Sequence, residues 1–390
     1  MKASSYLSRG VSPTKDDVKL AVASQSKGLF PGSFCKLIPD LAGDEAWCMA
    51  VHADGAGTKS ALAWMMFRET GSTGWFNGIA QDSLVMNIDD LLCIGATSGF
   101  LLSNTIGRNA HLVDAACLQA VISGYDQAID HLNRYGAGIV MTGGETADVG
   151  DLVRTMICDS TVTVRLPREH VINAADIRPD QVIIGLSSFG RMNGEDRENS
   201  GIGSNGLTAA RHLMLSDVYR ERYPQTYAET IDRQSVYCGR WQLDDALPGS
   251  SLTVGEALLS PTRSYLPVVA QILPLYQEHI SGLIHCTGGG QIKCRDFGHG
   301  IRYVKDQLFD RPAIFEAIAQ SGQINEPEMY QVFNMGHRME LYCDESVAGA
   351  ILAICRAWQL DAKIIGHTEA SSDPGHNEVI IHDRGQNLRF

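Results

Sequence analysis

The first half of the chain alternates short apolar segments with amphipathic ones, a pattern that predicts strands and helices in turn. Three apolar segments predict strands: residues 47–52, 100–106 and 139–142. Two segments space their apolar residues at helical intervals: 82–94 and 111–135. The stretch "RTMICDSTVTVRLPRE" predicts one long strand that Pro167 closes. This half is therefore a mixture of helices and strands.

After residue 170 the alternation begins again. The segment 182–190 predicts a buried strand, and a polar stretch then leads into a helix that begins near Leu207. Residues 216–251 are polar and irregular, which predicts a surface excursion. Helices are expected at 265–276, 311–320 and 345–358, with strands near Ile284, Met339 and Ile364. The repeat of the pattern predicts two α+β or α/β domains, residues 1–170 and 171–390, joined near 166–178.

Composition narrows the class of protein. With 390 residues and 44% hydrophobic content, the chain can form two separate cores. A net charge of −13 argues against nucleic acid as a partner. The start of the chain does not have the pattern of a signal peptide and no apolar run reaches membrane-spanning length, so we expect a cytoplasmic protein without a membrane partner. The ten cysteines form no CxxC pair, which predicts reduced thiols and no structural metal.

The stretch "ADGAGTKS" follows the first predicted strand and has residues that suit a polyphosphate. Gly55 and Gly57 allow the backbone to approach a ligand, while Thr58 and Lys59 offer a hydroxyl and a positive charge. The spacing is not that of a Walker loop. Asp54 adds a carboxylate that makes sense if magnesium bridges it to phosphate oxygens. A glycine turn with a capping aspartate explains these residues equally well.

Further acids offer oxygen ligands for the same cation. Asp82 and Asp90 are eight residues apart and fall on nearly the same helix face. Solvated helix acids are the commoner explanation, but Asp89 makes the local charge denser and favours a bound cation. In "TGGETAD", Gly143 and Gly144 end a strand and place Glu145 where it can join the aspartates. A plain turn is the alternative.

Two glycine-rich stretches of the second half are candidates for anion binding. "GIGSNG" matches the dinucleotide pattern only weakly, because its strand ends a dozen residues earlier; Ser204 or Asn205 is expected to cap the helix at Leu207 and leave amides for an anion. "HCTGGGQ" combines a histidine, His285, with a candidate phosphate nest. A packed histidine and a simple cap are the alternatives. Arg263 in "SPTRSY" is either a second anion contact or a salt bridge.

These motifs, in this order, resemble the aminoimidazole ribonucleotide synthetase family, also called phosphoribosylformylglycinamidine cyclo-ligase. The segments "DGAGTK", "DSLVMNIDDL", "GGETAD", "GSNG", "LSPTRSY", "HCTGGG" and "EMYQVFNMG" are similar to the family's DGVGTK, D-x7-ND-L, GGETAE, HSNG, LxPTRxY, HxTGGG and EMxxxFNxG. The start "YLSRGVS" resembles its YxxAGVD opening. The resemblance covers most of the chain.

The resemblance implies a two-domain PurM-like fold. In it, the N-terminal domain binds ATP and Mg²⁺ and dimerises through a β-barrel-like interface flanked by helices, and an α/β C-terminal domain binds the substrate. It implies a homodimer that uses ATP to close the imidazole ring of formylglycinamidine ribonucleotide through a phosphorylated amide oxygen. The metal acids by resemblance are Asp54, Asp82, Asp90 and Glu145, and the catalytic residues are His285, Lys59 and Asp82. The nucleotide or substrate contacts by resemblance are Asp54, Gly55, Gly57, Thr58, Lys59, Asp82, Asp90, Gly143, Gly144, Glu145, Ser204, Asn205, Thr287, Gly288, Gly289 and Gly290.

The chain also departs from the family pattern. The nucleotide loop before DGVGTK is represented only by "GLFPGSFCK", and segments 188–203 and 216–251 are enlarged. Gln291 replaces an aromatic residue, while His337 and Arg338 replace small or apolar ones. The alternatives are another ATP-using member of the superfamily, similar to selenophosphate synthetase or to the amidine-forming synthetase, and a non-catalytic nucleotide-binding homologue.

Overall fold

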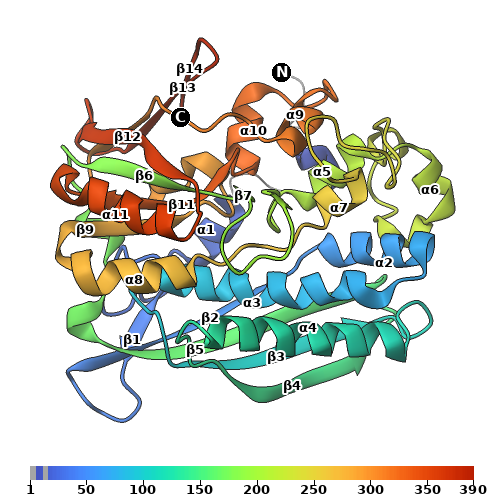
Figure 1. The fold of residues 1–390 in the computed structure, drawn as a ribbon, viewed down its shortest axis with the longest axis horizontal. Coiled ribbons are helices and arrows are strands. Elements are labelled where there is room, and N and C mark those ends of the chain that lie inside the picture. The colour runs from blue at the N-terminus through green and yellow to red at the C-terminus, as the bar shows by residue number, and fades with distance from the viewer. Residues whose placement is uncertain (1–5, 12–15) are drawn as a thin grey trace.

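Five strands from the first half form one open sheet in the computed structural model, which describes residues 6–11 and 16–390 (Figure 1). The strand order is β1-β2-β5-β3-β4, with β3 and β4 parallel and the other pairs antiparallel. The opening motif "YLSRGVS" extends to Ser12, which lies outside the described residues. The strands are β1 (Leu37–Pro39), β2 (Trp47–Gly55), β3 (Phe100–Arg108), β4 (Val140–Asp148) and β5 (Met156–Pro167).

Helices cover one face of this sheet, and two of them, α2 and α3, also contact the second half of the chain (Figure 1). Every residue of α3 from Asp82 to Leu92 is buried, because the sheet and α4 lie on one side and β9 and α8 on the other. The close approach to α4 requires Gly124, where a Cβ would lie 2.4 Å from the Asn77 oxygen. Buried acids on α3 therefore need partners from the second half. The helices of this half are α1 (Asp16–Val22), α2 (Lys59–Thr70), α3 (Asn77–Leu92) and α4 (Ala115–Asn133).

The other face of the sheet is bare, since no helix of residues 6–11 and 16–390 covers it, and it carries an apolar row. The register aligns Val51 with Thr163, Thr163 with Leu101, and Leu101 with Val140. The three apolar members of the row, Val51, Leu101 and Val140, are 55%, 49% and 55% exposed. A row of large apolar side chains in solvent is a feature of interaction surfaces.

The second half forms a seven-stranded mixed sheet in the order β14-β13-β10-β12-β6-β11-β9, with a short β7-β8 pair beside it. The strands are β6 (Val182–Ser187), β7 (Phe189–Gly190), β8 (Asn199–Ser200), β9 (Ile280–His285), β10 (Ile301–Lys305), β11 (His337–Cys343), β12 (Ala362–Ala370), β13 (Glu378–Asp383) and β14 (Gln386–Arg389). The helices are α5 (Leu207–Met214), α6 (Val218–Arg222), α7 (Val254–Leu258), α8 (Leu266–Tyr276), α9 (Ala313–Ala319), α10 (Glu326–Val332) and α11 (Glu345–Ala357).

Most of the strands and helices expected from the sequence form, and both halves mix helices with strands as predicted. The long strand closes at Pro167, and α3, α4, α5, α8, α9 and α11 fall on predicted helices. Two predictions were wrong. "TGGETAD" is not a loop but the second part of β4, and residues 216–251 include α6 and short 3-10 helices rather than irregular chain alone. No helix among the described residues is long and apolar enough to cross a membrane.

Candidate active site

Lys59, the first residue of α2, joins three other motifs through one buried ammonium group. Its Nζ donates to Asp82 Oδ1 at 2.9 Å and to the backbone oxygens of Gly203 and Ser260 at 3.2 and 2.5 Å. The side chain is 0% exposed. Since an ammonium has three hydrogens to donate, these bonds saturate it. Lys59 thus holds α3 against two turns of the second half, and a contact with phosphate would require this network to open.

Asp82 is enclosed in the same network. Its Oδ1 also accepts from the N–H and the hydroxyl of Thr262 at 2.7 and 2.5 Å, and that hydroxyl lies 2.9 Å from Ser204 Oγ. Its Oδ2 is buried and has no hydrogen-bond partner among the described residues. The Lys59 and Asp82 pair is therefore a junction between the two halves of the chain.

The accessible part of "DGAGTK" lies beside this junction. Gly57 is exposed with φ of +57°, and Thr58 is exposed with its hydroxyl 2.9 Å from that of Thr208 on α5. Gly55 lies against β5, where a Cβ would meet Asp159 Oδ1 at 1.8 Å, so only glycine fits there. Half-buried Asp54 accepts from the N–H of Gly55 at 2.7 Å. Asp54, Gly57 and Thr58 are the residues of the motif that a ligand can reach.

The turn before α5 differs from its predicted form. α5 begins at Leu207 as expected, but its N-cap is Gly206, with φ of 78° and no side-chain cap. Ser204 is bonded to Thr262 instead, and Asn205 Oδ1 is buried with no hydrogen-bond partner in the described part of the chain. The prediction that Ser204 or Asn205 caps the helix was wrong, because the glycine at the left-handed position already turns the chain.

Asp90 lies between two histidines at the other end of α3. His285 Nδ1 is 2.5 Å from Asp90 Oδ1, and His52 Nε2 is 3.1 Å from Asp90 Oδ2. Both carboxylate oxygens are thereby used. Burial by itself raises the pKa of Asp90, but the hydrogen bonds from His285 and His52, together with the charge of His52, bring that pKa well below its usual range. Asp90 is a carboxylate that holds two imidazoles in place.

Asn87 determines the protonation of His52. Its Nδ2 donates to the backbone oxygens of Asp54, Ser83 and Ser160, so its Oδ1 must accept from His52 Nδ1 at 2.9 Å. The other ring nitrogen of His52 faces the Asp90 carboxylate, so both nitrogens donate and the ring is an imidazolium. Burial opposes the charge, but Asp90 raises the pKa of His52 to about 9.

The hydrogen bonds of His285, in contrast, identify its imidazole ring as neutral. Arg338 Nε donates to His285 Nε2 at 2.9 Å, so that nitrogen accepts and Nδ1 carries the proton that Asp90 receives. Arg338 also pairs with Asp89 at 3.2 Å and lies over the Tyr265 ring. His285 is fully buried with both nitrogens engaged. Its geometry favours orientation over proton exchange.

The triple-glycine loop follows His285 and has one buried and one accessible side. Thr287 and Gly290 are buried, whereas Gly288 and Gly289 are half-buried. At Gly290 a Cβ would lie 2.5 Å from the oxygen of Tyr330, so the loop packs tightly against α10. The backbone of Gly288 and Gly289 is the part that a ligand can approach.

Glu145 does not join the other acids within one chain. The register aligns it with Thr105, then Asp159, then Gly55, so it lies three strands from β2, about 14 Å away. His52 contacts α3, so the alternate residues of β2, and Glu145 with them, face the bare side of the sheet. Gly143 and Gly144 belong to the same strand, with Gly144 packed against Asn104.

The four predicted metal acids therefore do not form one magnesium site in this arrangement. No three of them lie close enough to share an ion in the described part of the chain. Asp82 and Asp90 are separated by about 12 Å along α3, and each already has a cationic partner. Asp54 and Glu145 are the acids of this set without such a partner in the described chain. A single Mg²⁺ bridging all four residues does not fit this geometry.

Sequence reasoning missed His52, Asn87 and Arg338. His52 directly precedes the quoted motif "ADGAGTKS", and its alternation with Asp54 places both side chains on the α3 side of β2. Arg338 was noted only as a departure from the family. A buried acid on α3 needs cationic partners, and that requirement was the available signal.

Of the two roles considered for Arg263, the structure shows the salt bridge. Its Nε and Nη2 each lie 2.6 Å from an oxygen of Glu195, and it also donates to three backbone oxygens of residues 187–190. It anchors the enlarged 188–203 segment. A cavity of about 560 Å³ lies between this segment and helices α3 and α4, and of the candidate residues named from the sequence only Arg263 lines it.

The chain has two mixed sheets, and buried aspartates of α3 connect the half that contains the first sheet to the half that contains the second. This arrangement is that of the PurM-like fold. Solved structures agree with this class. The hydrogenase maturation protein HypE is 15% identical with a TM-score of 0.55, covering 90% of this chain and 89% of that one. T. maritima PurL, solved with FGAR, is 14% identical with a TM-score of 0.53 over 97% of this chain. The chain spans about half the length of PurL, 53%.

The chain belongs to the AIR synthase related protein family. The family's N-terminal domain matches residues 37–164, and its C-terminal domain matches residues 178–377. The phosphoribosylformylglycinamidine cyclo-ligase of Methanocaldococcus jannaschii is 26% identical over 85% of this chain and 81% of its own length. That of Thermococcus gammatolerans is 31% identical over 74% and 70%. These matches confirm the family that the motifs predicted.

Proposed function

We propose that this chain is a phosphoribosylformylglycinamidine cyclo-ligase, an ATP-dependent ligase that forms a carbon–nitrogen bond in purine biosynthesis. ATP phosphorylates the formyl oxygen of formylglycinamidine ribonucleotide, a substrate nitrogen attacks the same carbon, and phosphate leaves with the oxygen. The products are 5-aminoimidazole ribonucleotide, ADP and phosphate. A cytoplasmic enzyme that acts on a small molecule is part of this proposal.

The observation that carries the proposal is the convergence of the cyclo-ligase motifs. The Lys59 ammonium contacts Asp82 of "DSLVMNIDDL", the "GSNG" turn and the "LSPTRSY" segment at once. At the other end of α3, Asp90 contacts the histidine of "HCTGGG". Segments up to 201 residues apart thus meet along one helix, as expected if the motifs serve one site.

The accessible groups between these two contacts are those that would hold substrate and phosphate. Asp54, Thr58 and the backbone of Gly288 and Gly289 are exposed or half-buried, whereas Lys59, Asp82 and His285 are fully buried. We infer that the buried three position the site and that the accessible groups touch the reactants. Burial first, and then the Asp90 charge, raise the pKa of Asp54, which makes this carboxyl better suited than His285 to exchange a proton.

Nucleotide binding is proposed on the family resemblance. PurL of T. maritima has been solved with ADP and with AMPPCP. ATP as phosphoryl donor suits the glycine-rich and hydroxyl groups of the site. Magnesium would accompany ATP and neutralise its phosphates; of the predicted acids, Asp54 is the one open to it beside Thr58.

We also propose a homodimer that packs the bare face of the first sheet against its copy. The row formed by Val51, Leu101 and Val140 supplies the apolar surface, and Glu145 lies on the same face. This interface would supply the barrel-like arrangement implied by the resemblance. Replacing Leu101 by Glu should convert a dimer into a monomer in light scattering; a monomeric wild-type protein would refute this part.

The activity is tested with purified protein, ATP, Mg²⁺ and formylglycinamidine ribonucleotide. We expect ADP and aminoimidazole ribonucleotide in equal amounts, with ATP turnover that depends on the ribonucleotide. ATP binding without turnover would instead support a non-catalytic homologue. ADP formed without the imidazole product would support another ATP-using member of the superfamily.

A further inference from the structure

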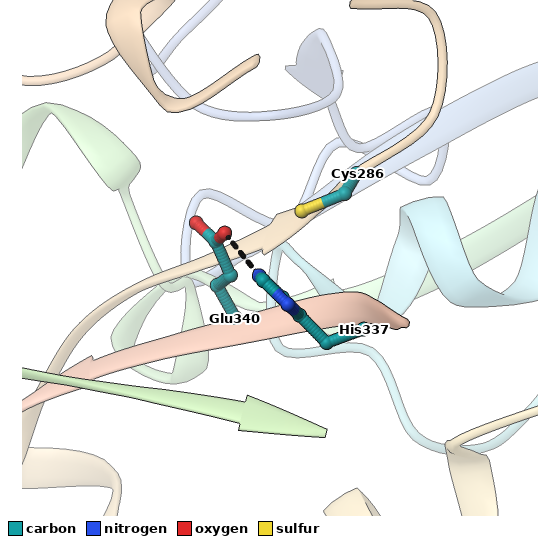
Figure 2. A group of neighbouring side chains, drawn as sticks. All are labelled: Cys286, His337 and Glu340. Atoms are coloured by element: carbon teal, nitrogen blue, oxygen red, sulfur yellow. Dashed lines mark hydrogen bonds and ion pairs between the residues drawn. The ribbon is translucent and has the colours of Figure 1, made fainter. Parts of the chain in front are cut away.

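Cys286, His337 and Glu340 form a buried group with the residue types of a metal site (Figure 2). One ligand atom from each lies within 4.8 Å of the others. His337 and Glu340 extend from β11, and Cys286 follows β9 directly. All three residues are buried.

A lysine already occupies the position that a metal would take beside Glu340. Lys305 Nζ is 2.5 Å from Glu340 Oε1, the same oxygen that is 2.9 Å from His337 Nε2. The Tyr342 hydroxyl donates to Glu340 Oε2 at 2.5 Å. The carboxylate therefore has a cation and two further donors, and a divalent ion would have to displace the ammonium. This group is a hydrogen-bonded network and not a metal centre.

The network reaches the triple-glycine loop through Gln291. Lys305 Nζ donates to the backbone oxygen of Gln291 at 2.5 Å. Gln291 Nε2 donates to the backbone oxygens of Asn334 and His337, the latter at 3.1 Å. Lys305, Glu340 and Gln291 are 0% exposed. Gln291 directly follows Gly290. The bonds to its side chain and to its carbonyl oxygen therefore fix the backbone at the end of the triple-glycine loop.

The fold leaves room for this network across the sheet. Lys305 lies on β10 and Glu340 on β11, and β12 and β6 run between them. On β6 the residue in register with Glu340 is Gly185, where a Cβ would lie 3.3 Å from His337 Cγ and 2.8 Å from Ile365 Cγ2. A larger residue at 185 would clash with this group.

Asn334 extends the network to a second site loop. Its Nδ2 donates to the Gly201 oxygen at 2.8 Å, and its Oδ1 accepts from Ser188 at 2.8 Å. Asn334 thereby links the triple-glycine loop to the start of the "GIGSNG" turn, since its backbone oxygen accepts from Gln291 and its side chain donates to Gly201. Two of the departures from the family pattern, Gln291 and His337, contact each other and belong to this single unit.

We propose that Gln291, Lys305, His337 and Glu340 are positioning residues that fix the backbone of the 287–291 loop for substrate binding. A buried ion pair contributes little net stability, since well-packed neutral residues replace such pairs without loss. The consequence of the buried Lys305 and Glu340 pair is geometric, because the pair determines the position of the Gly288 and Gly289 backbone. This inference rests on the proposed function for the identity of the substrate.

The test is the charge-neutral double variant Lys305→Met/Glu340→Gln. The amide that replaces the Glu340 carboxylate would still accept from His337, but no ammonium would hold the Gln291 carbonyl. The matched control is Arg302→Met/Glu378→Gln, which removes a partly exposed pair with 3.0 Å separation between β10 and β13 of the same sheet. Both variants are compared with wild type by thermal unfolding, steady-state kinetics and hydrogen exchange of residues 287–291.

We expect the double variant to fold with a Tm close to that of the control, with faster amide exchange in the loop. Its KM for formylglycinamidine ribonucleotide should rise about tenfold or more, while kcat and the KM for ATP change less than about threefold. Unchanged exchange together with an unchanged KM would overturn the proposal. So would one equivalent of a transition metal that co-purifies with wild type and is lost in Cys286→Ala.

The two proposals can fail separately. A wild-type protein that does not turn over this substrate refutes the proposed function, and the hydrogen-exchange comparison still decides whether the network holds the loop. An active wild type with a double variant that matches it in all three measurements refutes only the network.

Discussion

The two ends of α3 both present a buried aspartate to the second half of the chain, but their partners differ. Asp82 faces one lysine and a threonine, and every group around it is fully buried. Asp90 faces two histidines, and His52 and Asp90 have side chains 22% and 10% exposed. The first end is a closed junction, whereas the second borders the surface that a ligand can reach.

This difference shows that one residue type on one helix face serves two purposes. At the Asp82 end the cation is a fully buried ammonium, whose pKa burial lowers and the Asp82 charge raises, with a net shift downward. At the Asp90 end imidazoles supply hydrogen bonds whose direction is set by Asn87 and Arg338. The Asp82 end joins the two halves, and the Asp90 end orients the groups beside the accessible glycines.

The largest effect is expected at the closed end. Lys59→Met leaves Asp82 charged and unpaired in the interior, which should lower the free energy of unfolding by about 3–5 kcal/mol. Denaturant unfolding measures it, with Arg302→Met as a control for a partly exposed pair, which should cost less than about 1 kcal/mol. Equal losses in the two variants would remove the distinction between a junction and a surface pair.

The Asp90 end should show a pH dependence that comes from His52. The pKa of His52 is raised to about 9 in the folded chain, against about 6.5 when unfolded. The stabilisation is therefore fully present below pH 6.5 and is lost as the pH rises through 9, a change on the order of 3 kcal/mol. Unfolding at pH 6.5 and 9.5 should differ less in His52→Gln than in wild type. An identical difference would show that His52 is not charged.

Asp90→Asn should affect activity more than the fold. The substitution removes the charge between His285 and His52 and turns an N–H toward one of them, so His285 loses its fixed orientation. We expect kcat/KM for the cyclo-ligase reaction to fall about 100-fold. Asp130→Asn, on the exposed face of α4, is the control and should leave the rate unchanged. An active Asp90→Asn enzyme would mean that the histidines are held by other groups.

The smallest effect is expected at the exposed edge of the junction. Thr58→Val removes the hydroxyl contact with Thr208 at 2.9 Å but keeps the shape, and should cost less than about 1 kcal/mol of unfolding free energy. Thr208→Val, which removes the other hydroxyl of this pair, serves as the control, since either substitution breaks the same hydrogen bond. A loss near that of Lys59→Met would show that the hydroxyls, and not the ammonium, hold the halves together.

The sequence alone supports much of the fold, because apolar spacing depends on neighbours in the chain. The long strand ending at Pro167 and the helices α3, α4 and α11 were expected from such spacing. α2 was not, since "KSALAWMMFRET" is apolar on most of its surface and follows a motif interpreted as a turn. β4 was cut short because paired glycines usually end a strand, whereas here Gly144 packs against Asn104 within the sheet.

The site was harder to predict, because its geometry depends on residues far apart in sequence. The spacing of Asp82 and Asp90 places them on one face of α3, but nothing local shows that Lys59 meets one and His285 the other. Glu145 was grouped with them by motif, and only the strand register shows that it faces the opposite side of the sheet. Residue types indicated the chemistry, while pairing across the halves determined which groups are free to perform it.

The saturated ammonium of Lys59 has a mechanical consequence. Separating the two halves at that point would remove two of the three acceptors of the buried ammonium, the Gly203 and Ser260 oxygens, whereas at the far end of α3 Asp90 would lose one bond, to His285. We therefore expect an opening of the two halves to leave the contacts of Lys59 intact. Reactants would enter and leave from the Asp90 side, past the loop that Gln291 anchors.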